Sequence, residues 1–186
     1  MTDRLGRRAF LRAGAVALGT GLSAGVASPA LAKLGTANFR ALAFQNLHTG
    51  EKLEAEYWAD GAYQPDVLAS VNHVLRDYRN NEVHVIDPKL LDLLNLLQRR
   101  LGSNAEIQVI SGYRSPATNA AMHAESKGVA AHSLHMKGQA IDIRLGDTAL
   151  DRLHDAALAL QAGGVGYYPS LDFVHVDVGR VRRWNG

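Results

Sequence analysis

The sequence predicts a single α+β domain, in which helices pack around a small antiparallel sheet. The chain has 186 residues, of which 47% are hydrophobic, and this is enough to bury one core. Segments that alternate polar and apolar residues, as strands do, are interspersed with segments whose apolar residues recur at helical spacing. The chain shows no internal repeat, no low-complexity tract and no sign of a second domain.

The first 32 residues do not belong to this domain. Arg7 and Arg8 precede a weakly apolar run that ends at Ala30-Leu31-Ala32, a small-residue pattern typical of a cleavage site. We interpret residues 1–32 as a twin-arginine export signal cleaved after Ala32, which leaves residues 33–186 as a domain in the periplasm or cell envelope. A membrane anchor is the weaker alternative, because Gly and Pro interrupt a segment that is short for a span.

Charge and cysteine content exclude several classes of protein. Removal of residues 1–32 takes away Asp3 and four arginines, so the formal charge falls from +2 to about −1, and nucleic acid is not an expected partner. We expect no membrane contact after signal removal. The chain has no cysteine, which excludes disulfides, thiolate ligands and a Cys nucleophile. Any metal must therefore use His and carboxylate ligands.

The first half of the domain reads as a hairpin followed by two helices. Residues 38–44 and a strand through Trp58 flank a turn at 46–51. We interpret His48 in this turn as a surface or turn-stabilising residue in preference to a metal ligand. Apolar residues from Val67 to Tyr78 follow helical spacing. The next helix is rich in leucine, and Asp87 as its cap, Pro88 and Gly102 mark its ends.

The second half reads as strands separated by short helices. A strand at 107–110 leads into a loop, and a short helix begins at Ser115 or Thr118 and runs through Met122, before a further loop at 125–131. Residues 139–145 form a strand, Asp147 caps a helix closed by Gly163-Gly164, and 165–168 with 173–178 form a hairpin.

A metal site is indicated by His135 and Asp142. In a strand through 139–145, Ile141 and Ile143 face one side, so Asp142 faces the other, and Gly138 allows a tight turn that brings His135 back over that face. Zinc accepts imidazole and carboxylate, and a catalytic site needs three protein ligands with one open position. His175 is the best candidate for the third ligand. His132 is a weaker candidate than its neighbour His135.

A metal site of this kind is hydrolytic and needs a carboxylate as general base and acid. Asp172 and Asp177 compete for this role, and strand parity does not decide between them, because Pro169-Ser170-Leu171 can bend the chain before Asp172. Asp177 shares a strand face with His175 and is alternatively a partner that orients a ligand histidine. Arg114 follows a strand exit, where it either binds a substrate carboxylate or developing oxyanion, or forms a surface salt bridge.

These motifs resemble those of a known superfamily. The pattern Ser133-x-His135-x-x-Gly138-x-Ala140-x-Asp142, with Asp172-x-x-His175 downstream, resembles the D-Ala-D-Ala carboxypeptidase branch of the LAS metallopeptidases. The whole domain looks closest to the murein endopeptidase K family. The further motifs that carry this resemblance are Asn46-x-His48-Thr49-Gly50-Glu51, Arg76-Asp77, Ser111-Gly112-Tyr113-Arg114-Ser115-Pro116 and Gly163-Gly164-Val165-Gly166-Tyr167-Tyr168-Pro169.

The resemblance implies a role for each candidate residue. His135, Asp142 and His175 would be zinc ligands, Asp172 the catalytic acid and base, and Arg114 a residue that orients substrate or stabilises the transition state. The carboxypeptidases commonly carry Glu and aromatic residues before the last His, where this chain has Asp172-Phe173-Val174. The shorter acid is a departure that bears on the choice of base.

The resemblance also implies a substrate, the stem peptide of peptidoglycan. Members of the family cleave cross-links that involve meso-diaminopimelate, including the L,D-type 3-3 bond. The expected function is thus an exported zinc-dependent peptidoglycan hydrolase, a murein L,D-/D,D-endopeptidase. Two alternatives stay open: a D,D- or L,D-carboxypeptidase on the same substrate, and a catalytically inactive zinc-containing wall-binding module, as in hedgehog. Asp172 argues against the second.

Overall fold

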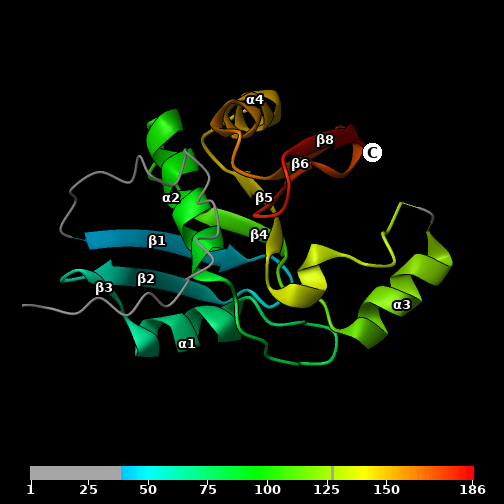
Figure 1. The fold of residues 1–186 in the computed structure, drawn as a ribbon, viewed down its shortest axis with the longest axis horizontal. Helices are drawn as coiled ribbons and strands as arrows, with labels where there is room; N and C mark the ends of the chain where they lie inside the picture. The colour runs from blue at the N-terminus through cyan, green and yellow to red at the C-terminus, as the bar shows by residue number, and fades with distance from the viewer. Residues whose placement is uncertain (1–38, 127) are drawn as a thin grey trace, which may run out of the picture.

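The computed structural model describes residues 39–126 and 128–186 of the chain (Figure 1). The predicted export signal and the predicted start of the domain at residue 33 lie outside the described residues. Within the described part, no helix combines the length and the apolar character that crossing a bilayer requires.

One mixed sheet organises the domain, in the strand order β3-β2-β1-β4-β5-β7-β6-β8. The strands are β1 (Phe39–Asn46), β2 (Lys52–Ala59), β3 (Ala62–Tyr63), β4 (Ile107–Ser111), β5 (Ala140–Leu145), β6 (Gly164–Tyr168), β7 (Phe173–Asp177) and β8 (Arg182–Asn185). The predicted α+β class and single domain are confirmed. The sheet is larger than predicted and is not purely antiparallel, since β1 pairs in parallel with β4 and β6 with β8.

Four α-helices and two described 3₁₀ turns complete the fold. They are α1 (Pro65–Val74), α2 (Pro88–Leu101), α3 (Pro116–Glu125), α4 (Leu150–Leu160), η2 (Leu134–Lys137) and η3 (Pro169–Leu171). The predicted ends of α2 are confirmed: the Asp87 carboxylate accepts a hydrogen bond from Lys89 N, and Gly102 adopts the left-handed conformation with φ of 66°. Ser115 caps α3 by accepting from Thr118 N, and α3 runs three residues beyond the predicted Met122.

Two predicted helix ends are wrong. The Asp147 carboxylate does not cap α4, which begins after Ala149 without a side-chain cap, because Asp147 instead accepts a hydrogen bond from Ser103 Oγ at 2.9 Å. Gln161, with φ of 51°, ends α4 in place of Gly163-Gly164. These glycines instead allow close approach to Asp177, whose carboxylate accepts a hydrogen bond from Gly164 N at 2.9 Å.

The predicted first helix also differs, because α1 stops at Val74 and Tyr78 lies outside it. The Tyr78 ring instead stacks on His48 with centroids 3.8 Å apart. The apolar spacing continues past the helix end because Leu75 is fully buried in the core without being helical. Spacing alone therefore did not locate this helix end.

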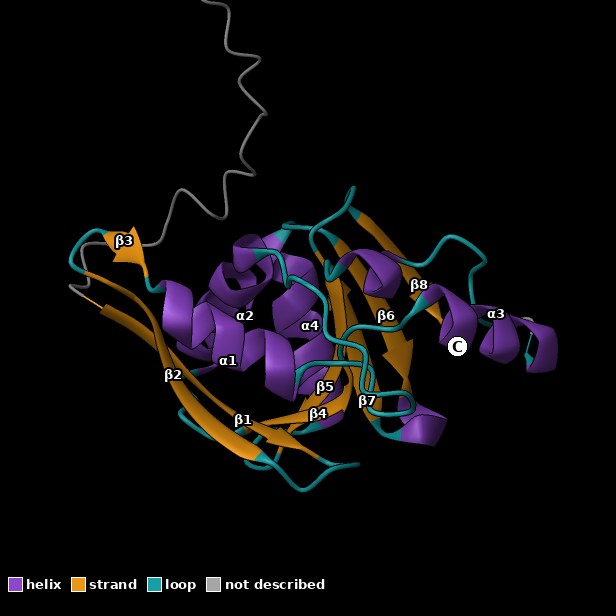
Figure 2. Ribbon diagram, turned by 90° about the horizontal axis from the view of Figure 1, so that it is seen from below, coloured by secondary structure: helices purple, strands orange, loops and turns teal. Residues whose placement is uncertain are grey.

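The sheet has one face covered by helices and one face that carries polar groups. Figure 2 shows α1, α2 and α4 on the same side of the curved sheet, with α3 on the other side near β6 to β8. Ile141, Ile143 and Val174 are fully buried in the core. Strand alternation then directs Asp142 and His175 to the opposite face.

Asp77 fixes the loop between α1 and α2 to the start of α3. Its carboxylate is 1% exposed and accepts hydrogen bonds from Ser115 N at 2.9 Å and from Arg79 N at 3.1 Å. Burial alone would raise the pKa of Asp77, but hydrogen bonds from Thr118, Ser115 and Arg79 outweigh it and hold the pKa below the usual value. The ionised form therefore stabilises the fold next to Arg114.

We expect Asp77→Asn to lower the free energy of unfolding by about 1–3 kcal/mol at pH 7, because one buried N–H loses its acceptor. A folded-state pKa below the unfolded value of about 3.9 means that the stabilisation is present above that pH and is lost as the pH falls through the folded-state pKa. Urea unfolding of both proteins from pH 7 to pH 3 should show the deficit shrinking below about pH 4. A deficit that stays constant over this range would assign it to packing.

Candidate metal centre

Three separate elements present the three predicted ligands to one point. Ser133 Oγ accepts a hydrogen bond from His135 N at the start of η2, and Gly138, with φ of 63°, ends that turn as predicted. The β5–β7 register places Asp142 directly opposite His175. All three residues are buried, with exposed fractions of 8% or less.

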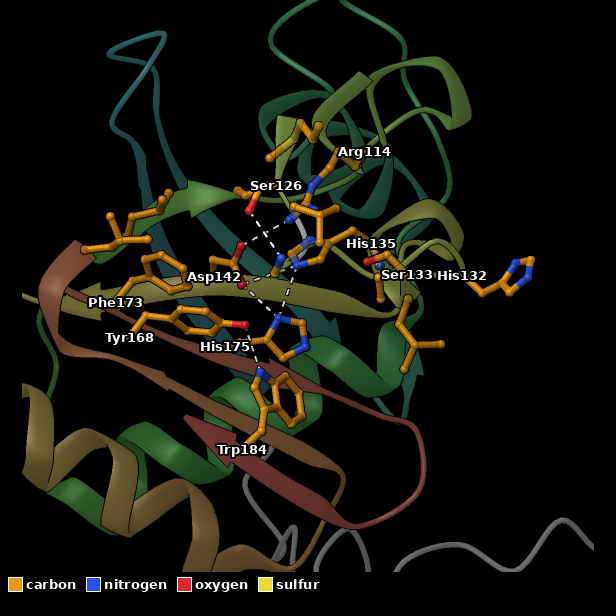
Figure 3. A pocket seen from close by; sticks show the side chains of 18 of the residues that line it. Arg114, Ser126, His132, Ser133, His135, Asp142, Tyr168, Phe173, His175 and Trp184 are labelled. Atoms are coloured by element: carbon orange, nitrogen blue, oxygen red, sulfur yellow. Dashed lines mark hydrogen bonds and ion pairs between the residues drawn. The ribbon is translucent and has the colours of Figure 1, made fainter. Parts of the chain in front are cut away.

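The atoms that face one another form a compact triangle. Asp142 Oδ1 lies 2.8 Å from His175 Nδ1 and 3.2 Å from His135 Nε2, and the two imidazole nitrogens are 3.2 Å apart (Figure 3). In tetrahedral zinc sites with ligand distances of about 2.0–2.1 Å, neighbouring ligand atoms lie about 3.3 Å apart. The spacing of the triangle therefore fits a small tetrahedral cation.

In each imidazole, the nitrogen farther from the centre makes a hydrogen bond that assigns the ring proton to it. The nitrogen that faces the centre therefore has a free lone pair. His135 Nδ1 lies 2.7 Å from the Gly112 carbonyl oxygen, which only accepts, so Nδ1 carries the proton. His175 Nε2 lies 3.2 Å from Asp177 Oδ2, which likewise accepts. In the neutral rings, two nitrogen lone pairs and a carboxylate oxygen thus converge with no proton between them, and a cation satisfies this arrangement.

Electrostatics at the centre also favour a cation. Burial lowers the pKa of His135, so its neutral, ligating form is favoured. Burial would raise the pKa of Asp142, but positive charge on the neighbouring imidazoles holds it far below the usual range. Burial would lower the pKa of His175, but Asp142 and Asp177 raise it. The carboxylates therefore attract positive charge to the centre, and a bound cation would supply it in place of a proton. The donor set of two imidazoles and one carboxylate is one that zinc binds.

Asp177 supports His175 from behind. Its side chain is 0% exposed, and its oxygens accept hydrogen bonds from Gly164 N, Gly179 N and the guanidinium of Arg182. Burial would raise the pKa of Asp177, but His175 and Arg182 hold it well below its usual range. This geometry fits a carboxylate that would orient His175 toward a bound metal.

Arg114 lies against the same centre. The side chain is 7% exposed, and its Nη2 is 3.3 Å from Asp142 Oδ2. Its Nε is buried and has no hydrogen-bond partner among the described residues. A cation with an unused donor therefore lies beside the ligand group, and its pair with Asp142 is buried and not at the surface.

The chain that carries this centre is similar in sequence to known proteins over nearly its whole length. Residues 34–184 match the family model described as Peptidoglycan L,D-endopeptidase MepK. The chain belongs to this family. It is 47% identical over 178 residues to "Peptidoglycan L,D-endopeptidase MepK" of Escherichia coli (strain K12), with 96% of each chain covered. It is 42% identical over 181 residues to "Probable peptidoglycan L,D-endopeptidase MepK" of Haemophilus influenzae, with 97% of this chain and 96% of the relative covered.

In this MepK family member, an open cavity of about 610 Å³ lies over the ligand triangle. Tyr168, Phe173 and Trp184 form an aromatic wall of this cavity, and the stacked rings of His48 and Tyr78 also line it. His48 Nε2 also contacts the Ile110 carbonyl oxygen at 3.0 Å, so the predicted turn residue contributes to the cavity as well. The cavity leads from the surface to the side chains of His135, Asp142 and His175.

Asp172 lies at the edge of this cavity. It follows η3 in the left-handed conformation with φ of 55°, its side chain is 62% exposed, and its carboxylate pairs with Arg144. Its neighbours Leu171 and Phe173 line the cavity. The structure therefore brings together His135, Asp142, His175, Asp177 and Arg114, while the Asp172 carboxylate points to Arg144 and does not contact them.

Other histidines do not join the group. The His132 side chain is exposed and points away from the centre (Figure 3), and His123 Nδ1 lies 2.6 Å from the Val129 carbonyl oxygen. Sequence reasoning missed the aromatic wall, in particular Tyr168 and Trp184. Strand alternation offered one signal for Tyr168. It lies two residues after Gly166 in a predicted strand, so both residues share one face of that strand.

Proposed function

We propose that this MepK family member is an exported zinc-dependent peptidoglycan hydrolase that cleaves the peptide cross-links between stem peptides as an L,D- or D,D-endopeptidase. The observation that carries the proposal is the convergence of three ligand atoms, from His135, Asp142 and His175, at the floor of an open cavity. The names of the Escherichia coli and Haemophilus influenzae relatives support the substrate and the bond.

The ligand triad would hold one zinc ion. When bound, the ion supplies Lewis-acid chemistry, because it lowers the pKa of water and polarises a carbonyl group. Asp177 would hold the proton on His175 Nε2 and so keep Nδ1 directed at the ion. The Gly112 carbonyl would do the same for His135.

Asp172 would act as the general base and acid in this proposal. Its exposed side chain is free to rotate from Arg144 toward the cavity, where it would take a proton from the attacking water and deliver one to the leaving amine. Arg114 would bind a stem-peptide carboxylate or the developing oxyanion with its unused donors, while its contact with Asp142 holds it in place.

The proposed place of action is the periplasm or cell envelope, where peptidoglycan lies. Residues 1–32 would direct the chain there by the twin-arginine route, which moves folded proteins. This route suits a domain that acquires its metal before export. Protein partners are not part of the proposal.

Metal analysis paired with muropeptide digestion tests the proposal. We expect about one zinc per chain and cleavage of cross-linked dimers that stops on chelation and returns when zinc is added. The measurement is elemental analysis of the purified protein, with chromatography of the digests. Zinc without any cleavage would favour a wall-binding module, and a protein without metal would contradict the proposed site.

A carboxypeptidase is the second candidate, favoured by the buried cation Arg114, which suits a terminal carboxylate close to the scissile bond. The same digestion separates the two. Release of free D-Ala from monomeric stem peptides without splitting of dimers would establish the carboxypeptidase. Splitting of dimers would establish the endopeptidase.

A further inference from the structure

Tyr168 lies on the same sheet face as the ligand triad. In the antiparallel β6–β7 pair, Gly166 is opposite His175 and Tyr168 is opposite Phe173. Opposite residues share a face, and so do residues two apart in one strand. Tyr168 and His175 are therefore on the face that carries the metal centre, whereas Tyr167 is on the helix-covered face and stacks on His154 of α4 at 4.6 Å.

The hydrogen bond between Trp184 and Tyr168 fixes the direction of the tyrosine hydroxyl. Trp184 Nε1 lies 2.8 Å from Tyr168 Oη, and an indole N–H only donates, so the oxygen of Tyr168 accepts. The proton of the Tyr168 hydroxyl is therefore still available for a hydrogen bond to another acceptor. No described residue accepts it, and Figure 3 shows the hydroxyl end of Tyr168 directed toward His175 and Asp142.

Both aromatic rings that support this hydroxyl are held in place. Phe173 stacks on the Tyr168 ring at 4.5 Å, and the Trp184 indole lies 5.1 Å from the His175 ring. A Cβ at Gly166 would lie 2.6 Å from Trp184 Cε2, so only glycine leaves room for the indole there. The donor is thus oriented before any substrate binds.

We propose that the Tyr168 hydroxyl is a catalytic hydrogen-bond donor, which contacts the carbonyl oxygen of the scissile peptide bond as negative charge develops on it, and that Trp184 is its positioning residue. The inference rests on the proposed function. Arg114 lies in the loop after β4 and Tyr168 at the end of β6, and Figure 3 shows them on different sides of Asp142 and His175. Fixed donors of this kind act mainly on the transition state.

The alternative role for Tyr168 is that of a wall whose ring contacts the stem peptide. Tyr168→Phe separates the two, because it keeps the ring and its stacking on Phe173 but removes the hydroxyl. We expect kcat on a cross-linked muropeptide to fall about 10- to 100-fold, with KM changed less than about threefold. Zinc content and Tm should match those of the unsubstituted protein.

Tyr167→Phe is the matched control, since it removes the same hydroxyl from the adjacent residue on the opposite face. We expect its kcat to stay within about twofold of that of the unsubstituted protein. Trp184→Phe tests positioning: it should lower kcat when Tyr168 is present and add little when combined with Tyr168→Phe. Losses that multiply in the double variant would overturn the role of Trp184.

A binding measurement gives a readout that is independent of turnover. A phosphinate analogue of the cross-link, with tetrahedral phosphorus in place of the scissile carbonyl carbon, should bind Tyr168→Phe at least about tenfold more weakly by calorimetry, whereas a cleaved product peptide should bind equally. Unchanged kcat and unchanged phosphinate affinity in Tyr168→Phe would overturn this role alone. Failure of the unsubstituted protein to cleave or to bind the analogue would overturn the proposed function and this role with it.

Discussion

Replacing His135 with alanine is expected to abolish metal binding and peptidase activity together. His135 is 2% exposed and contributes one of the three converging ligand atoms, so its loss leaves two ligands, too few for a stable catalytic zinc site. Cleavage of muropeptide dimers should fall by more than about 1,000-fold, because the Lewis-acid chemistry is lost with the ion. Elemental analysis of His135→Ala should find far less than one zinc per chain.

His132→Ala is the matched control for this variant. It removes an imidazole three residues earlier in the chain, just before η2, but the His132 side chain is exposed and points away from the centre (Figure 3). We expect full zinc content, because His132 lines the cavity but contributes no atom to the ligand group. Full zinc occupancy in His135→Ala would show that the ion is held elsewhere and would contradict the proposed ligand set.

Local signals in the sequence predicted most of the elements. The ends of α2 are marked by Asp87, Pro88 and Gly102, and these act within a few residues of the helix they delimit. Strand alternation around Ile141 and Ile143 gave the face of Asp142 for the same reason. Such features are readable because the residues that determine them are adjacent in the chain.

Features that depend on distant contacts were not predicted. Asp147 looks like a helix cap, but its carboxylate accepts from Ser103, 44 residues earlier. β8 contains two arginines, a tryptophan and an asparagine, a composition without a strand signal, and it forms because Trp184 packs on Gly166 and Arg182 pairs with Asp177. The parallel pairing of β1 with β4 joins segments separated by two helices.

The candidate site likewise combines residues that local sequence patterns predict with residues that depend on distant contacts. The residue types and spacing of His135 and Asp142 identify them as ligand candidates, and alternation places His175 and Asp177 on one face. The aromatic wall could not be derived in this way, because the contact between Trp184 and Tyr168 depends on a strand pairing that the sequence did not predict.

Replacing Asp172 with asparagine is expected to keep the metal and lose turnover. Asparagine preserves the size of the side chain and tolerates the left-handed φ of 55° at this position, but it is not a proton acceptor in this role. We expect kcat to fall about 100- to 10,000-fold, with zinc content and Tm close to those of the unsubstituted protein, because the side chain is 62% exposed. Steady-state digestion of a muropeptide dimer, with elemental analysis, provides the measurement.

Asp177→Asn is the informative comparison, because the same chemical change is made at a buried carboxylate. Here we expect a loss of stability of about 1–3 kcal/mol, since the buried side chain loses charged hydrogen bonds while Arg182, which is 31% exposed, can be solvated. We also expect a 10- to 100-fold weaker affinity for zinc, because His175 loses the group that orients it. The Asp172→Asn substitution should thus lower turnover alone, whereas Asp177→Asn should lower zinc affinity and stability.

The two aspartates exchange roles if the results are reversed. A fully active Asp172→Asn beside a zinc-loaded, folded and inactive Asp177→Asn would identify Asp177 as the base and assign Asp172 to the surface pair with Arg144. The contacts of Asp177 argue against this outcome, because its oxygens already accept hydrogen bonds from His175, Arg182 and two backbone N–H groups. A carboxylate engaged in this way, with its pKa held well below the usual range, is a weak proton acceptor. The Asp172 carboxylate is exposed, so it can leave Arg144 and take up a proton at a much smaller cost in free energy.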